Sequence, residues 1–254
     1  MKKSFLNIGL MLAMGLAAVT FNSCKSDEPN IRKDKFEIKA ENIIGNTSDL
    51  RTAAITWWPY SETGSTYEII AKVPFVNNGF TIHPPKILKD KYLEELLDGE
   101  DVPEGITISD RDARIFLLGE FETFEKDGFY RGYIWLVNQD SNDSKVYYAL
   151  WIYADRDVSI EGKASVNFCF DEIWGCYYYN LEYDNMNLKK GWNSTYLVID
   201  FSESLTTSTI SQLWTTQKPT EVELKWQFEA ADIIIIDFST KSKVLKNRKS
   251  LFIR

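Results

Sequence analysis

The sequence predicts an all-β protein, built as an antiparallel β-sandwich with a smaller N-terminal β-subdomain. Two observations support this fold class. Segments rich in β-branched and aromatic residues follow one another along the chain, and Gly, Asn, Asp, Ser and Pro separate them. The intervals between these segments are too short for the crossover connections of parallel strands, which take a dozen or more residues. Consecutive strands are therefore expected to be antiparallel.

The N-terminal part is expected to form a β-subdomain of four strands that ends in a short helix. The helix is predicted over residues 91–98, KYLEELLD, because Leu93, Leu96 and Leu97 form a small apolar stripe at helical spacing. Asp90 is its expected N-cap, and Gly99 stands just beyond its end. The four strands are predicted at residues 36–44, 51–59, 65–75 and 79–85.

The second part is a series of longer strands, predicted at residues 113–125, 129–137, 145–154, 158–170, 174–183, 194–201 and 221–228. Lys126-Asp127-Gly128 indicates a hairpin turn between the first two. The strand at 145–154 is apolar on both sides, so we expect a second sheet, another subdomain or a ligand to cover each face. Because neighbouring strands of this kind can also close on themselves, a lipocalin-like β-barrel is the alternative fold.

The first residues have the form of a secretory signal. Lys2 and Lys3 precede an apolar run, residues 5–21, that is short for a membrane-spanning helix, which needs about 20 apolar residues. An uncleaved N-terminal anchor is the alternative. Cys24 follows this run, and Lys-Ser-Asp-Glu-Pro comes directly after it. The stretch resembles a bacterial lipobox, and its looser form is similar to the lipoproteins of Bacteroides and related bacteria.

The resemblance implies that Cys24 becomes the first residue of the mature protein and carries a lipid. In that group a short acidic stretch after the Cys goes with export to the cell surface, so the expected location is the outer membrane, facing outside. Three further segments, NNGFTIHPPKILKDKYLEELL, WIYADRDVSIEG and MNLKKGWN, resemble recurring segments of uncharacterised Bacteroides lipoproteins. This second resemblance covers most of the mature chain and implies no known reaction.

The chain is predicted to have five parts. They are a signal peptide (1–23), a tether (24–35), an N-terminal β-subdomain ending in a short helix (36–100), a C-terminal antiparallel β-domain (101–238) and a basic tail (239–254). The formal net charge is −8 at pH 7, whereas proteins that bind nucleic acid gather Lys and Arg on one face. Nucleic-acid binding is therefore not expected, and the basic tail is expected to be solvated.

Cys169 and Cys176 lie seven residues apart in a predicted hairpin. In an exported protein such a pair forms a disulfide or stays as two buried free thiols, and both alternatives remain open. No His stands nearby to complete a metal site. Two Asp-Arg-Asp triplets, at 110–112 and 155–157, offer oxygens to calcium, but each Arg can neutralise its flanking acids. We therefore expect turns there, and no bound metal.

The sequence predicts no catalytic residue, so the protein is not expected to be an enzyme. Its single His, His83, stands before two prolines, and the chain contains neither a G-x-S-x-G elbow nor an HExxH zinc motif. The glycine-rich phosphate loops are also missing, and no cofactor is expected. Two carboxylates held across a sugar would be enough for a glycoside hydrolase, which stays open as an alternative.

Aromatic residues are the best candidates for a ligand site. Trp57, Trp58 and Trp192 come first, because Trp57 and Trp58 point to opposite faces if extended and Trp192 is expected on a turn. Exposed rings can stack on sugars, although Trp and Tyr also fill protein cores. The expected function is a non-catalytic binding or accessory module for glycans or other nutrients. A structural or adhesive module that contacts partner proteins is the alternative.

Overall fold

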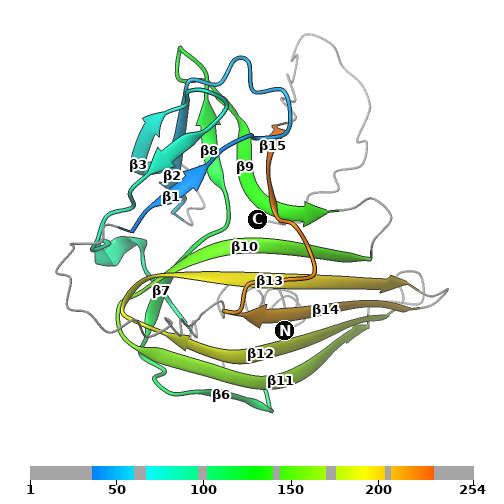
Figure 1. Cartoon of the computed structure of the whole chain (residues 1–254). Helices are drawn as coiled ribbons and strands as arrows, with labels where there is room; N and C mark the ends of the chain where they lie inside the picture. Colours follow the sequence, from blue (N-terminus) through cyan, green and yellow to red (C-terminus); the bar gives the residue numbers. More distant parts are fainter. Residues whose placement is uncertain are drawn as a thin grey trace, which may run out of the picture.

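A computed structural model of the chain describes residues 36–59, 67–96, 102–139, 144–169, 176–203 and 207–231. Within these residues the protein is all-β, as the sequence predicts, and one short 3-10 helix, η1 (Asp90–Tyr92), lies among the strands (Figure 1). The strands are β1 (Ile38–Ala40), β2 (Thr52–Trp57), β3 (Glu68–Pro74), β4 (Phe80–Ile82), β5 (Glu94–Glu95), β6 (Ile106–Ile108), β7 (Arg114–Leu118), β8 (Phe121–Phe124), β9 (Tyr130–Gln139), β10 (Lys145–Ala154), β11 (Val158–Cys169), β12 (Cys176–Leu188), β13 (Gly191–Glu203), β14 (Thr207–Thr215) and β15 (Lys225–Ala230).

The strands form one sheet of 13 strands and a separate sheet of two, β1 and β4. The main path of the large sheet runs β3-β2-β8-β9-β10-β13-β14-β12-β11-β6, with β5, β7 and β15 off this path. The two ends of the path, β3 and β6, do not pair, so the barrel alternative is not formed. In Figure 1, β10, β13, β14, β12 and β11 lie one below another as a lower part, and β1, β2, β3 and β8 stand above them as an upper part.

Strand β9 belongs to both parts. Its first half pairs with β8, where Ile134 lies opposite Phe121, and its second half pairs with β10, where Leu136 lies opposite Ala149. Strand β15 pairs along the other edge of β9. Figure 1 shows β9 bending from the upper part until it lies beside β10. The upper and lower parts are therefore joined by continuous strand pairing.

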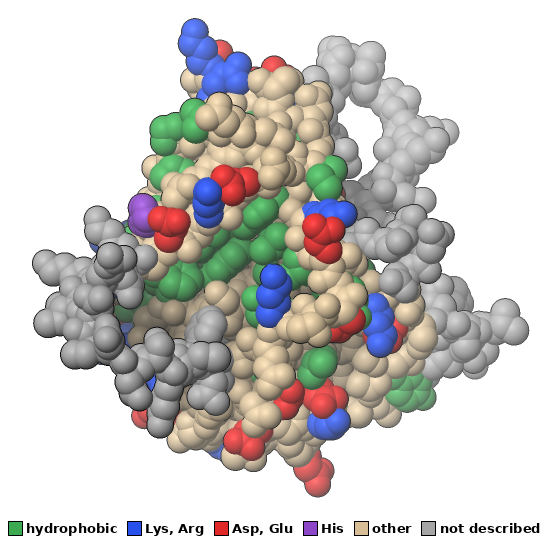
Figure 2. All heavy atoms as spheres, in the orientation of Figure 1, with side chains coloured by type: hydrophobic (Ala, Val, Ile, Leu, Met, Phe, Trp, Pro, Cys, Tyr) green, Lys and Arg blue, Asp and Glu red, His purple; other side chains and the backbone are tan. Residues whose placement is uncertain are grey.

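Protein covers both faces of β10, as its apolar sequence predicts. Tyr148 and Ile152 lie in the core of the lower part, whereas Trp151 and Tyr153 lie in a second core that β10 shares with the strands of the upper part. Every residue of β10 after Lys145 is buried. Figure 2 shows hydrophobic side chains gathered in a band between the upper and lower parts on the visible face.

One strand pair in the lower part is parallel. Strands β12 and β13 are joined by only two residues, Lys189 and Lys190, yet they do not pair with each other. Strand β14 forms an antiparallel hairpin with β13 and lies between β13 and β12, so it runs parallel to β12. Every other pair among the named strands is antiparallel.

The predicted helix at 91–98 is wrong over its described residues. The chain makes only the short turn η1 and then pairs as β5 with β7, where Glu94 lies opposite Ile115. Asp90 does not cap η1; its carboxylate instead lies 3.5 Å from the guanidinium of Arg114. Pairing with a distant strand has overridden a local helical pattern. Within the described residues, no helix has the length and apolar character of a membrane span.

Candidate ligand-binding site

Six aromatic rings follow one another across the upper part of the sheet. They are Trp58, Tyr67, Phe124, Tyr130, Tyr133 and Trp135, and we call them the aromatic face. Successive ring centroids lie 5.1 Å apart at the start, between Trp58 and Tyr67, and 5.8 Å apart at the end, between Tyr133 and Trp135. The last ring contacts Tyr148 in the core of the lower part. The rings therefore form a continuous series from the core to the outside of the sheet.

A β-bulge brings two tyrosines of β9 to this face. Tyr130 and Tyr133 stand three residues apart, a spacing that puts residues of a regular strand on opposite sides. The register shifts between Thr123 and Phe124 of β8, so that Phe124 lies opposite Tyr130 while Glu122 lies opposite Tyr133. Gly132 makes this local backbone possible.

Gly132 has a φ of +139°, a conformation that residues with a side chain rarely adopt. A Cβ at this position would also collide with the backbone oxygen of Glu229 on β15. The glycine in FYRGYIW therefore serves the bulge and the close approach of the neighbouring strand.

Charged side chains share the aromatic face with the rings. Residues directly opposite each other on neighbouring strands point to the same side of a sheet. The strand register places five residues in one such row across β3, β2, β8, β9 and β15: Lys72, Ala54, Glu122, Tyr133 and Glu229. The row therefore carries one lysine, two glutamates and a tyrosine ring between the glutamates.

Glu122 is almost completely enclosed, with 2% of its surface exposed. The indole Nε1–H of Trp58 donates a hydrogen bond to its Oε1. Such a bond to a carboxylate is stronger than one between neutral groups and fixes both side chains. Beside them, the Lys72 ammonium lies 5.1 Å from the centroid of the Phe124 ring, within the range of a cation–π contact.

Glu229 lies at the opposite end of the row and is exposed. The pKa of Tyr148 is raised to about 12. Burial of the ring is the main cause, and the negative charge of Glu229 is the smaller one. This electrostatic effect agrees with the strand register, which puts Glu229 on the same side of the sheet as Tyr133.

The rings of the aromatic face differ in exposure. Tyr67 is 36% exposed, and Trp58, Tyr130 and Tyr133 are partly exposed. Phe124 and Trp135 are buried beneath them. The partly exposed rings can therefore contact a ligand, while the buried rings hold them in place.

The structure separates the three tryptophans that the sequence selects. Trp58 belongs to the aromatic face, whereas Trp57 points to the other side and packs edge-on against Tyr92, with 5.5 Å between the ring centroids. The prediction that Trp57 and Trp58 point to opposite faces agrees with these contacts.

Trp192 lies at the second position of β13 and not on a turn. Its ring contacts Phe36, Phe116 and Tyr153, and its Nε1–H donates a hydrogen bond of 2.8 Å to the backbone oxygen of Pro85. Trp192 therefore joins β13 to the upper part of the molecule, on a different side of the sheet from Trp58.

The remaining predicted sites are placed as follows. Cys24 lies outside the described residues. The pairing of β11 with β12 puts the Cα atom of Cys169 directly opposite that of Cys176. His83 lies on the surface with its Nε2 3.6 Å from Oε2 of Glu37, and Figure 2 shows the histidine in purple beside an acidic side chain.

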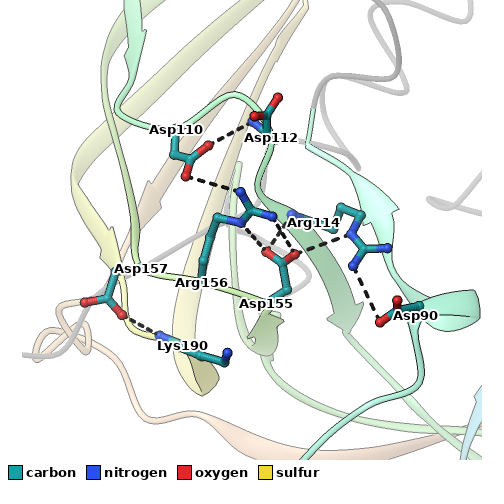
Figure 3. A network of polar contacts seen from close by, with 8 residues as sticks. All are labelled: Asp90, Asp110, Asp112, Arg114, Asp155, Arg156, Asp157 and Lys190. Atoms are coloured by element: carbon teal, nitrogen blue, oxygen red, sulfur yellow. Dashed lines mark hydrogen bonds and ion pairs between the residues drawn. The ribbon is translucent and has the colours of Figure 1, made fainter.

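The two Asp-Arg-Asp triplets meet in one network of ion pairs (Figure 3). Arg156 lies 3.1 Å from its neighbour Asp155 and 3.5 Å from Asp110 of the other triplet. Asp155 also accepts a 3.0 Å hydrogen bond from the backbone N–H of Arg114. Within the described residues no group of His, Cys, Asp and Glu could hold a metal ion. Of the two triplet arginines, Arg156 pairs with its flanking Asp155, whereas its other flanking acid, Asp157, lies 2.8 Å from the ammonium of Lys189.

Sequence reasoning missed most of the aromatic face, including Tyr67, Tyr130 and Tyr133, and it missed the neighbouring Glu122. A usable signal was present, because Glu122 is a charged residue on the same side of its strand as Phe124. Which side chains lie side by side across several strands depends on the strand register. Here the β-bulge between β8 and β9 sets that register.

Comparisons of the chain with models of protein families, with curated proteins and with solved structures found no match.

Proposed function

We propose that this protein is a lipoprotein held at the outer membrane through a lipid on Cys24, facing outside, and that it binds glycans through the aromatic face. It serves as a non-catalytic binding or accessory module. The observation that carries the proposal is the series of partly exposed rings beside Lys72, Glu122 and Glu229. The lipid anchor rests on the resemblance of FNSCKSDEP to a lipobox.

Aromatic rings and charged groups on one surface can bind a sugar together. The apolar face of a pyranose stacks on an aromatic ring, while its hydroxyl groups bond to carboxylate oxygens and ammonium hydrogens. Glu229 is exposed and lies directly opposite Tyr133, so a sugar ring on Tyr133 has a carboxylate acceptor beside it. Because the partly exposed rings contact one another, they lose little side-chain freedom on binding.

Binding to a panel of neutral, acidic and amine-bearing oligosaccharides tests the proposal. The mature chain, residues 24–254 with Cys24→Ala, is titrated with each oligosaccharide by calorimetry. At least one should bind, and Trp58→Ala should weaken that binding by about tenfold, since losing a stacked ring costs ~1–1.5 kcal/mol.

Trp57→Ala is the matched control, because it removes the same side chain one residue away on the other side of the sheet. It should leave glycan affinity unchanged even if the variant is less stable. No binding across the panel, or equal losses from the two variants, would reject the aromatic face as the site.

The anchor is tested separately by fractionating cells that express the full chain. Cys24→Ala should move the protein out of the membrane fraction, whereas Ser23→Ala, the matched change next to it, should leave the protein there. Digestion by protease added to intact cells would support the outward orientation. A Cys24→Ala variant that stays in the membrane fraction would rule out the lipid at this residue.

A carboxylate-dependent glycoside hydrolase is the second candidate, because Glu122 and Glu229 share one row. Two strand spacings separate them, which puts their Cα atoms about 10 Å apart. Inverting hydrolases hold their carboxyl groups about 6.5–9.5 Å apart, with one raised in pKa as the acid. Release of reducing ends from a bound oligosaccharide, abolished by Glu229→Gln, would favour this candidate over the binding module.

A further inference from the structure

The charges around Tyr133 suggest which glycans the aromatic face selects. Both residues opposite Tyr133 are glutamates: Glu122 on one side and Glu229 on the other. The three side chains point to the same side of the sheet, so a ligand on the Tyr133 ring lies between two negative charges. An ammonium group is the ligand substituent that these charges would attract most strongly.

The aromatic rings also favour an ammonium group on the ligand. The face of an aromatic ring carries negative electrostatic potential and attracts cations within about 6 Å of its centroid. The protein already shows this contact on the same face, where the ammonium of Lys72 lies 5.1 Å from the centre of Phe124. Lys72 occupies the β3 end of the row, and Tyr133 with Glu229 lies three and four strands away from it.

The charge of the whole chain acts in the same direction. The formal net charge is −8 at pH 7, which favours the approach of positively charged ligands and opposes that of acidic ones. Charge complementarity is therefore both local, at Glu122 and Glu229, and global.

We propose that the aromatic face selects glycans that carry free, protonated amines, such as oligomers of glucosamine, over neutral and acidic glycans. This inference rests on the proposed glycan binding and adds the chemical class of the ligand. The sugar stacks on the partly exposed rings, and its ammonium group lies near Tyr133, donates to the exposed carboxylate of Glu229 and is attracted by the enclosed charge of Glu122. Glu229 is exposed and provides the readily tested contact, whereas Glu122 is enclosed and also supports the fold.

The decisive comparison uses two oligosaccharides of equal length and linkage that differ only at nitrogen. Oligomers of glucosamine carry amines, and oligomers of N-acetylglucosamine carry neutral amides. Both are titrated into the mature chain carrying Cys24→Ala in mildly acidic buffer, at about pH 6, where most of the amines are charged. The amine-bearing oligomer should bind about tenfold more tightly.

Glu229→Gln should reduce the affinity for the glucosamine oligomer by about fivefold and leave the affinity for the acetylated oligomer within twofold. Glu161→Gln is the matched control, because it removes the same charge from an exposed position on β11 in the lower part. It should leave both affinities unchanged. Glu122→Gln should act like Glu229→Gln if the variant folds, and Glu229→Gln suffices if it does not.

The outcomes separate this inference from the proposed function. Equal affinity for the two oligomers, or tighter binding of the acetylated one, overturns the amine selectivity while glycan binding stands. A preference for amines that survives Glu229→Gln unchanged overturns the assignment to these carboxylates. If no glycan of the wider panel binds at all, the proposed function and the inference both fail.

Discussion

Asn193 and Lys189 are joined by two hydrogen bonds of opposite direction. Oδ1 of Asn193 accepts from the backbone N–H of Lys189 at 3.0 Å, and Nδ2 donates to the backbone oxygen of Lys189 at 2.8 Å. Nδ2 also bonds the backbone oxygens of Gly191 and Ile152. Asn193 therefore satisfies backbone groups where β12 and β13 separate without pairing.

Replacing this side chain should destabilise the fold. Asn193 is 1% exposed, so Asn193→Ala leaves enclosed backbone groups without partners, and we expect a loss of about 3 kcal/mol in the free energy of unfolding. Asn193→Asp keeps the acceptor but loses the donor, and it should also destabilise. Urea unfolding measures both variants. Asn167→Ala, an exposed asparagine of β11, is the control and should change the free energy by less than about 0.5 kcal/mol.

The network around Asp155 should make stability depend on pH. Burial acts to raise the pKa of Asp155, but hydrogen bonds from Arg156 and Arg114 outweigh it, so the net pKa lies below its ordinary value. A lowered folded-state pKa stabilises the protein above the unfolded-state pKa, about 3.9, and this contribution is lost as pH falls through the folded-state value.

Asp155→Asn should therefore lower the free energy of unfolding by about 2 kcal/mol at neutral pH. The difference from the original protein should begin to shrink below about pH 4, where Asp155 of the unfolded state takes up a proton, and should vanish below the lowered folded-state pKa, where both states are protonated. Urea unfolding at a series of pH values measures it. Asp112→Asn, whose carboxylate makes no ion pair within the described residues, is the control. A deficit that stays constant with pH would contradict the electrostatic explanation.

Removing the hydroxyl of Tyr183 should cost little or nothing. This hydroxyl is buried in the core of the lower part and has no hydrogen-bond partner within the described residues; burial raises its pKa. Because an unsatisfied buried polar group is destabilising, Tyr183→Phe should leave stability unchanged or raise it by about 1 kcal/mol.

Tyr92→Phe provides the comparison for Tyr183→Phe. The buried Tyr92 donates a 3.1 Å hydrogen bond to Glu68, so loss of its hydroxyl should cost about 1 kcal/mol. Thermal unfolding of the two variants side by side gives the difference. A Tyr183→Phe variant that loses more stability than Tyr92→Phe would show that the Tyr183 hydroxyl has a partner such as an enclosed water.

A disulfide between Cys169 and Cys176 is one of the two alternatives that the sequence leaves open, and we predict it from the strand register. Their Cα atoms are direct partners across β11 and β12. Direct partners in antiparallel strands lie about 4.5–5.5 Å apart, within the range that a disulfide spans. Mass spectrometry of the alkylated, unreduced protein should find the two residues linked, and Cys169→Ser should cost about 2 kcal/mol. Recovery of both cysteines as alkylated free thiols would contradict the prediction.

Periodicity predicts the long strands well because each is buried on at least one face. The predicted strand at 145–154 matches β10, and the predicted strand at 158–170 matches β11 to within one residue. The single strand predicted at 113–125 is in fact β7 and β8, which separate at Gly119-Glu120 and pair with different partners. Gly119 is the local feature at that separation, because an isolated glycine within a strand pattern indicates a bulge or a break.

Elements that depend on distant partners were harder to predict. The sequence analysis did not predict strand β14, because TSTISQLWT is rich in Ser and Thr. This segment forms a strand by pairing with β13 on one side and β12 on the other. The helix predicted after Asp90 failed for the same reason, since β5 pairs with β7. The aromatic face requires the register of five strands, from Lys72 to Glu229, which sequence periodicity alone does not supply.

The position of β14 has a consequence for biogenesis. Ribosomal synthesis makes β12 and β13 before β14, so both strands exist for a time with the edges that β14 will later cover. Bare strand edges recruit other chains. Truncation just before Thr207 should therefore produce aggregates rather than a smaller soluble domain.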